Sequence, residues 1–338
     1  MFVPVVDQNQ KPLMPTTPSR AARWVRSGKA SPFWKKGVWC VRLNQEPSGR
    51  NTQPIALGID PGSKREGFTV KSESHTYLNI HAHAVDGNRI KKKLEARRNL
   101  RRSRRNRNTP CRQPRWSNRR QPKLAPSTKA RWQWKLRITD WLCKMFPIEA
   151  AVVEDIKAKT FRGKGGRWNK SFSPLQVGKQ WLYSELRKRF KYLETPQGFE
   201  TKQWRNEQGL RKTGKKLAEV FEAHCVDSWV LANSWVGGHI KPDNTELIIV
   251  QPLTSHRRQL HVQNFSKGGI RKQYGSTRSL GFERGSIVIH PKHGECLVGG
   301  TSKERVSLTD RKTGKRLTQC ARPEDIRFRS FNSFLVRG

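Results

Sequence analysis

Acidic residues are scarce in this chain. Its 338 residues include 26 Asp and Glu against 69 Lys and Arg, which gives a formal net charge of +43 at pH 7. A chain with such an excess repels itself and attracts polyanions. Charge alone therefore indicates nucleic acid as the partner, and it makes the position of each carboxylate informative about where chemistry takes place.

Long apolar runs are also missing. No stretch approaches the roughly 18 consecutive apolar residues that a membrane-spanning helix needs, and hydrophobic residues make up only 34% of the chain. Residues 1–15 carry an acid and prolines where a secretory signal would need a basic start and an apolar stretch. The composition therefore excludes an integral membrane protein, and we expect no membrane partner and a cytoplasmic location.

Closely spaced cysteines are absent as well. No two of the six lie within twenty residues of each other; they are Cys40, Cys111, Cys143, Cys225, Cys296 and Cys320. Without a CxxC pair a zinc ribbon is not expected. The chain is also too long and too basic for a typical disulfide framework, so we expect reduced thiols.

What is present divides the chain into five segments. Residues 1–52 combine short strands with one helix, and residues 53–88 begin with a buried strand that two further strands follow. Residues 89–126 are strongly basic. Residues 127–241 alternate helices with an apolar strand. Residues 242–338 contain short strands separated by turns, a pattern that predicts a small β-barrel.

The basic segment has an unusual pattern. Between residues 89 and 120 there are fifteen Lys or Arg and one acid, and residues 90–107 lack Pro and Gly. Good helix formers dominate this stretch, but it has almost no apolar face and its like charges repel. We expect a helix that orders against a polyanion, although such a run can also be a disordered basic tail. The candidate nucleic-acid contacts are Arg97, Arg98, Arg101, Arg102, Arg104 and Arg105.

Three carboxylates occupy comparable positions in the predicted core. Asp60 ends the first apolar strand, Glu154 lies near the end of a later one, and Asp227 follows His224 by three residues on a predicted helix over 217–236. Three of these residues also have an ordinary interpretation: Asp60 as a turn former, Glu154 as a solvated strand end, and His224 as a satisfied core or surface histidine. Together the carboxylates can hold two Mg²⁺ or Mn²⁺ ions that hydrolyse a phosphodiester, with the histidine placing the attacking water.

The order of these motifs resembles that of RuvC-type nucleases with an RNase H-like fold. Because Lys11-Pro12-Leu13-Met14-Pro15 precedes them and the arginine-rich segment interrupts them, the chain resembles the transposon-encoded IscB and IsrB proteins, relatives of the CRISPR type II nucleases. The resemblance implies an α/β fold: a PLMP domain over 1–52, a RuvC core over 53–88 and 127–241, a bridge helix and linker over 89–126, and a C-terminal β-rich domain over 242–338.

The resemblance also implies site residues. Asp60 matches the first catalytic Asp, Glu154 the Glu of the second motif, and His224 with Asp227 the third, where Ser228 stands in place of the usual Ala. Asp155 competes with Glu154, but strand alternation directs the two side chains to opposite faces, and the family pattern favours Glu154.

Further implied features concern partners. They are an omega-type guide RNA, a target double-stranded DNA, a monomeric protein within a ribonucleoprotein, and a prokaryotic, nucleoid-associated location. Guide pairing would read the sequence, while the C-terminal domain binds the guide RNA scaffold and a short target-adjacent motif. The candidates there are Arg257, Arg258, Lys267, Arg271, Lys272 and Arg278, among which the sequence does not choose.

A second nuclease domain is not expected. The 69 residues between Glu154 and His224 contain no histidine, which an inserted HNH domain would need, so the chain is closer to IsrB and is expected to nick only the strand that is not paired with the guide. Three alternatives remain. The first is a stand-alone RuvC-like resolvase, which has no use for the basic helix. The second is the related TnpB group, which carries a zinc ribbon that this chain has no paired cysteines to form. The third is a non-catalytic RNA-binding protein, which does not require the spaced carboxylates.

Overall fold

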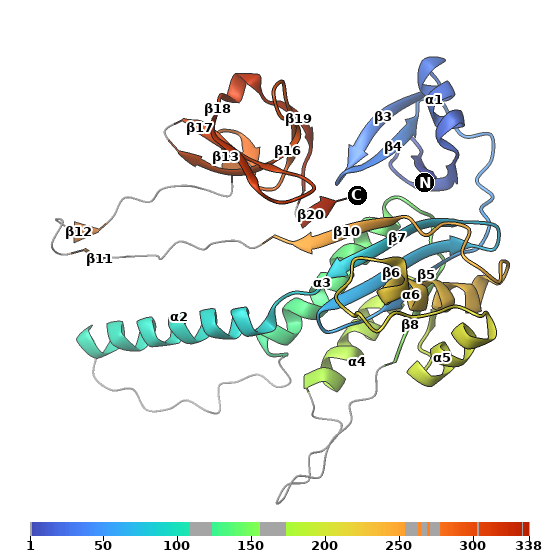
Figure 1. The fold of residues 1–338 in the computed structure, drawn as a ribbon, viewed down its shortest axis with the longest axis horizontal. Coiled ribbons are helices and arrows are strands. Elements are labelled where there is room, and N and C mark those ends of the chain that lie inside the picture. The colour runs from blue at the N-terminus through green and yellow to red at the C-terminus, as the bar shows by residue number, and fades with distance from the viewer. Residues whose placement is uncertain are drawn as a thin grey trace, which may run out of the picture. The chain divides into compact units, whose positions relative to one another are not determined.

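The computed structural model describes residues 2–108, 124–155, 174–253, 263–264, 269–270, 278–302, 304–332 and 334–337. Its backbone contacts divide the chain into two compact units (Figure 1). One unit is Asn51–Thr245. In the other, Met1–Arg50 joins Glu246–Gly338, so the two ends of the chain belong to the same unit. The finer predicted division at residues 52, 88, 126 and 241 stays a prediction.

A mixed sheet forms the centre of the unit over residues 51–245. Its strands are β5 (Ile55–Asp60), β6 (Arg65–Ser72), β7 (Thr76–His83), β8 (Ala150–Val153) and β9 (Tyr192–Glu194), in the spatial order β7–β6–β5–β8–β9. Strands β5, β6 and β7 form an antiparallel meander, while β8 and β9 run parallel to β5. Every residue of β5 and β8 is buried, as in strands covered on both faces. The predicted mixed α/β core is confirmed.

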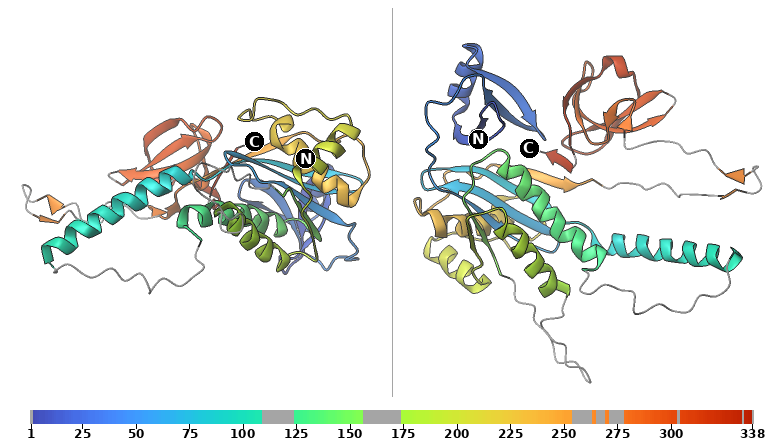
Figure 2. Two further views of the ribbon diagram at one scale, coloured as in Figure 1. Left: turned by 90° about the horizontal axis from the view of Figure 1, so that it is seen from below. Right: turned by 180° about the vertical axis from the view of Figure 1, so that it is seen from behind.

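Helices cover both faces of this sheet. Helix α6 (Phe221–Val236) packs on β5 and β6 and lies in front of the sheet in Figure 1. Helices α3 (Pro126–Cys143) and α4 (Pro174–Arg187) lie on the opposite face, which Figure 2 shows from behind. Helix α5 (Gly198–Glu207) packs against α6. The sequence predicts that α6 begins at residue 217, but residues 215–218 form a turn in which Ala218 N–H donates to the Lys215 carbonyl.

Helix α2 (Gly87–Asn108) confirms the helix predicted over residues 90–107. The Asp86 carboxylate caps it by accepting hydrogen bonds from the backbone N–H groups of Asn88 and Arg89, at 3.0 and 3.1 Å. Nearly all of its described side chains are exposed beyond residue 90. In its described part the helix therefore presents its arginines to solvent, as a segment without an apolar face must.

The N-terminal part of the other unit is a four-stranded sheet with one helix. Its spatial order is β2 (Pro12–Thr16), β1 (Val3–Val6), β4 (Val38–Leu43) and β3 (Ala30–Lys35), and α1 (Pro18–Arg26) follows β2 in the chain. Val3, Val5 and Val41 pack with Ala21 of α1 in a small core. The Pro12-Leu13-Met14-Pro15 motif lies in β2, where Leu13 is buried in that core.

The C-terminal part of this unit is rich in strands. Strand β10 (Leu247–Pro252) pairs with β20 (Phe334–Arg337), and two short hairpins are formed by β11 (Gln263–Asn264) with β12 (Gly269–Ile270) and by β13 (Arg278–Ser279) with β14 (Phe282–Glu283). A five-stranded antiparallel sheet has the order β18 (Arg316–Ala321), β17 (Arg305–Asp310), β16 (Gly294–Ser302), β15 (Ile287–His290) and β19 (Arg327–Ser330), with a 3₁₀ turn at Pro323–Asp325. Within the described residues no ladder joins β18 to β19, so the predicted barrel is an open sheet.

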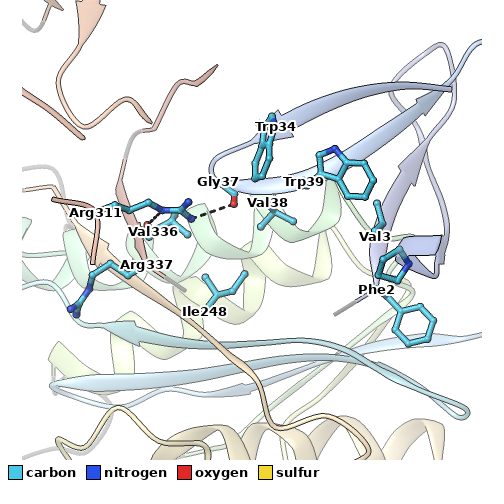
Figure 3. A pocket seen from close by; sticks show the side chains of 11 residues that line it. Phe2, Val3, Trp34, Gly37, Val38, Trp39, Ile248, Arg311, Val336 and Arg337 are labelled. Atoms are coloured by element: carbon cyan, nitrogen blue, oxygen red, sulfur yellow. Dashed lines mark hydrogen bonds between the residues drawn. The ribbon is translucent and has the colours of Figure 1, made fainter. Parts of the chain in front are cut away.

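A cavity of about 240 Å³ lies within this second unit (Figure 3). Trp34 and Trp39 line it, and Arg311 borders it by donating hydrogen bonds to the carbonyls of Val336 and Gly37, at 3.0 and 3.4 Å. None of the residues predicted to act in catalysis lines this cavity. The largely apolar space is therefore not where the sequence predicts chemistry.

Candidate active site

Two parallel strands bring Asp60 and Glu154 together. The register of β5 and β8 pairs Ile59 with Val153, and the Glu154 N–H donates to the Ile59 carbonyl at 3.1 Å. The next residues on the two strands, Asp60 and Glu154, therefore emerge side by side at the carboxyl ends, where ligands bind in open α/β sheets. Asp60 is buried, with only 4% of its surface exposed.

Helix α6 adds His224 and Asp227 to the same place. His224 Nδ1 lies 2.8 Å from Asp60 Oδ2, and its Nε2 lies 3.1 Å from the carbonyl oxygen of Lys216. Asp227, one turn further along, is buried. The structure thus brings together all four residues that the sequence predicts for catalysis.

Glycines in the sheet permit this close packing. A Cβ atom on Gly58 would lie 1.8 Å from the carbonyl oxygen of Ser228, and one on Gly67 would lie 2.4 Å from that of His224. The helix backbone therefore lies directly on β5 and β6. The Ser228 hydroxyl fits this narrow space, because it is buried and forms a 2.8 Å hydrogen bond with Thr69.

The carboxylates perturb one another. Burial, followed by the negative charges of Asp60 and Asp227, raises the pKa of Glu154 to about 7. Desolvation and like charges both disfavour the ionised form. The cluster is therefore a concentrated negative site that a cation would stabilise.

Two basic side chains already contact this cluster. Arg205 Nη1 of α5 lies 2.5 Å from Asp227 Oδ1, and Lys212 Nζ contacts the other oxygen, Oδ2. Burial opposes the charged form of Lys212, but Asp60 and Asp227 raise its pKa above the ordinary value. Sequence reasoning missed both residues, because nothing in the basic stretch ahead of α6 distinguishes them from its other cations.

The donor set can be tested against a divalent metal ion. Three carboxylates supply the hard oxygen ligands that Mg²⁺ and Mn²⁺ prefer. As the side chains stand, however, no three His, Cys, Asp or Glu in the described part of the chain are arranged to hold a metal ion. Both oxygens of Asp227 are bonded to Arg205 and Lys212. The donor atoms suit a divalent metal ion, but the metal ion would have to replace the side-chain cation of Lys212 or Arg205 at Asp227.

Asp155 faces away from the cluster. Its Oδ1 accepts hydrogen bonds from Lys179 Nζ at 2.5 Å and from the Tyr183 hydroxyl at 2.9 Å, both on α4. Glu154 instead lies beside Asp60 and near Asp227, whose charges raise its pKa. Glu154 and Asp155 therefore lie on opposite faces of the sheet, as strand alternation predicts.

Buried polar groups also lie beneath the site. The His81 ring is 5.7 Å from the His224 ring and fully buried, and burial, with the nearby charge of His224, lowers the pKa of His81 to about 4. Glu66 forms a buried ion pair with Lys135 of α3 at 2.6 Å. His81 is therefore neutral at pH 7. The negative charge of ionised Glu66 is balanced by the ammonium of Lys135.

The predicted nucleic-acid contacts are only partly described. Arg97, Arg98, Arg101 and Arg102 are exposed on α2. The side chains of Arg104 and Arg105 in its last turns lie outside the described residues, as does the side chain of Arg278 in β13. Arg257, Arg258, Lys267, Arg271 and Lys272 lie outside the described residues altogether.

Comparisons with known proteins give two similarities. Residues 3–169, just under half of the chain, match a family model described as "RRXRR protein", and that motif is present as Arg101-Arg102-Ser103-Arg104-Arg105. Among solved structures, the chain is similar to the yeast mitochondrial Holliday junction resolvase Ydc2, with 13% identity and a TM-score of 0.27 over 56% of this chain and 80% of the resolvase. No curated protein matches the chain. Within the described residues, no helix has the length and apolar character to cross a membrane.

Proposed function

We propose that this protein is an RNA-guided DNA endonuclease that nicks one strand of its target by metal-dependent phosphodiester hydrolysis. The observation that carries the proposal is the convergence of Asp60, Glu154, His224 and Asp227 at the carboxyl ends of β5 and β8. In a chain with so few acids, two buried carboxylates beside a third, partly buried one are costly unless they act together on a cation.

The residues have distinct roles in this proposal. Asp60, Glu154 and Asp227 hold Mg²⁺, for which Mn²⁺ can substitute. When bound, a pair of such ions activates water and stabilises the leaving oxygen of a phosphodiester. His224 is oriented by the Lys216 carbonyl on one side and by Asp60 on the other. With its Nε2–H donating to the Lys216 carbonyl, Nδ1 is placed to share a proton with Asp60 at the edge of the carboxylate cluster.

Helix α2 supports the proposal that the protein binds nucleic acid, both as guide RNA and as target DNA. Along this 22-residue helix Arg97, Arg98, Arg101 and Arg102 are exposed, and a chain of charge +43 binds phosphate backbones by releasing their counterions. In this proposal the helix binds the phosphate backbone of an omega-type guide RNA and of its heteroduplex with target DNA. Residues 242–338 bind the RNA scaffold and the target-adjacent motif. The assembly is a single protein chain with one RNA, in a prokaryotic cytoplasm near the nucleoid.

One catalytic site implies one cut. The described residues between Glu154 and His224 form α4, β9, α5 and the loop before α6, and the whole interval lacks histidine. The proposal therefore contains no second nuclease. The guide-paired strand is held in the heteroduplex, so the displaced, non-target strand is the one that is cut.

A plasmid assay tests the activity. The protein with guide RNA and Mg²⁺ should convert a supercoiled target plasmid to open circles, and denaturing gels should show cleavage only in the strand not paired with the guide. Glu154→Gln should abolish nicking, while Asp155→Asn, its neighbour on the opposite face, should retain it. Linear product, cleavage of the guide-paired strand, or the reverse order of these two variants would contradict the proposal.

The alternatives give different results in the same preparation. A stand-alone resolvase would cut four-way junctions without RNA. A non-catalytic RNA-binding protein would nick nothing and would co-purify with ribosomal or other structured RNA. Sequencing of the co-purifying RNA should instead give one abundant structured RNA with a variable end.

A further inference from the structure

The loop between α5 and α6 places one lysine inside the carboxylate cluster. Lys212 Nζ contacts Asp227 Oδ2, and the charges of Asp60 and Glu154 also act on this ammonium. Its side chain is 29% exposed, whereas that of Asp227 is 2% exposed. A positive charge therefore stands among the three carboxylates on the side that is open to solvent.

The second cation on Asp227 differs in mobility. Arg205 lies on helix α5, and its side chain is 13% exposed with Nη1 on the opposite oxygen, Oδ1. Lys212 lies on a loop, and an ammonium is a compact point charge on a flexible stem. Of the two cations, Lys212 is the one that can leave without moving a helix. Arg205 can remain and orient Asp227.

We propose that Lys212 is the internal counter-ion of the metal-free site, and that a divalent cation binds by displacing its ammonium from Asp227. The proposal rests on the proposed metal-dependent function and adds the residue that sets how tightly the site takes up metal. It accounts for the coexistence of a suitable donor set with an arrangement that holds no metal as it stands. It also explains how three adjacent carboxylates are tolerated in the folded protein before metal enters.

Metal binding by the free protein tests this directly. Full-length protein freed of nucleic acid is titrated with Mn²⁺, and free Mn²⁺ is measured by electron paramagnetic resonance. Asp60→Asn identifies the binding that belongs to the carboxylate cluster. Lys212→Met should lower the Kd of that Asp60-dependent binding by about five- to tenfold, because a competing charge has been removed.

Two further variants serve as controls. Lys215→Met removes the same charge from an exposed position in the same loop and should leave the Kd unchanged. Lys212→Arg keeps a cation at the cluster and should bind Mn²⁺ within about twofold of the unaltered protein.

Thermal unfolding supplies a second readout. Without metal, Lys212→Met should melt at a lower temperature, and Mg²⁺ should raise its Tm by more than it raises that of the unaltered protein or of Lys215→Met. Failure of Lys212→Met to fold even with Mg²⁺ would overturn the inference, since the ammonium is not required once metal is bound.

The outcomes separate this inference from the proposed function. Asp60-dependent Mn²⁺ binding that Lys212→Met leaves equal or weaker would refute the role of Lys212 and leave the nuclease intact. Mn²⁺ binding that is indifferent to Asp60→Asn in every variant would refute the metal site itself, and both proposals with it.

Discussion

Gly58 links the packing of the core to the geometry of the site. It lies in β5, two residues before Asp60, and α6 passes directly over it. A Cβ atom added at this position would lie 1.8 Å from the Ser228 carbonyl oxygen and 2.8 Å from the Ala232 backbone nitrogen. Both obstacles are backbone atoms of a helix, so no side-chain rotation can relieve the clash.

The size of the effect follows from these distances. Ordinary contact begins near 3.4 Å, so Gly58→Ala must move α6 away from β5 by roughly 1.6 Å or distort it. Overpacking of this kind costs about 1–3 kcal/mol of folding free energy. The same shift separates His224 and Asp227 from Asp60, and a misplacement of about 1 Å can cost about 100-fold in rate. We therefore expect nicking to fall by about 100-fold or more and the folding free energy to fall by about 1–3 kcal/mol.

Nicking rates and thermal melts of Gly58→Ala test this reasoning. Gly49→Ala is the matched control, because a Cβ there meets nothing within 4 Å, and it should leave both measurements unchanged. A Gly58→Ala protein that nicks at the unaltered rate would show that α6 does not hold the site against β5. Loss of guide RNA binding in the same variant would also contradict the argument, since α2 lies outside the affected contact.

Four further predictions follow from the same structure. Asp60→Asn should abolish nicking but change RNA affinity by less than about twofold in a filter-binding assay, because binding is carried by many basic side chains. In metal-free protein, the pKa of Glu154 is about 7, whereas in the unfolded chain it is near 4.5. The free energy of unfolding should therefore fall by about 3 kcal/mol as pH rises from 4.5 to 7 and then level off. Thermal melts of Glu154→Gln over the same pH range should lack this fall. Lys135→Met should lower stability by about 3–5 kcal/mol in urea unfolding, since it removes the partner of the buried Glu66 carboxylate, whose pKa burial already raises and which must then take up a proton, and a loss below about 1 kcal/mol would argue against the pair. Hydrogen exchange over residues 90–107 should slow on addition of guide RNA, and equally strong protection in the free protein would show that α2 does not depend on a polyanion.

Local pattern was sufficient for several parts of this protein. The apolar strands that end at Asp60 and near Glu154 could be identified from runs of buried residue types, and period-two alternation correctly separated Glu154 from Asp155. Helix α2 followed from a stretch of helix formers without Pro or Gly. These features depend on neighbours in the chain, which a sequence displays directly.

Other predictions failed where long-range pairing decides the outcome. The barrel expected over residues 242–338 is an open sheet in its described part, because closure depends on whether the first and last strands pair. The start of α6 was misplaced because the turn over residues 215–218 competes with helix in a stretch of good helix formers.

The sequence by itself determined which residue types stand at the ends of the core strands and on α6, and hence the candidate set of Asp60, Glu154, His224 and Asp227. Only the tertiary structure decided that Lys212 contacts that cluster and that the backbone of α6 packs directly on Gly58. The physical reason is that both facts depend on which loop and which helix cross the sheet at that point. Such crossings arise from packing between distant segments, and no local periodicity encodes them.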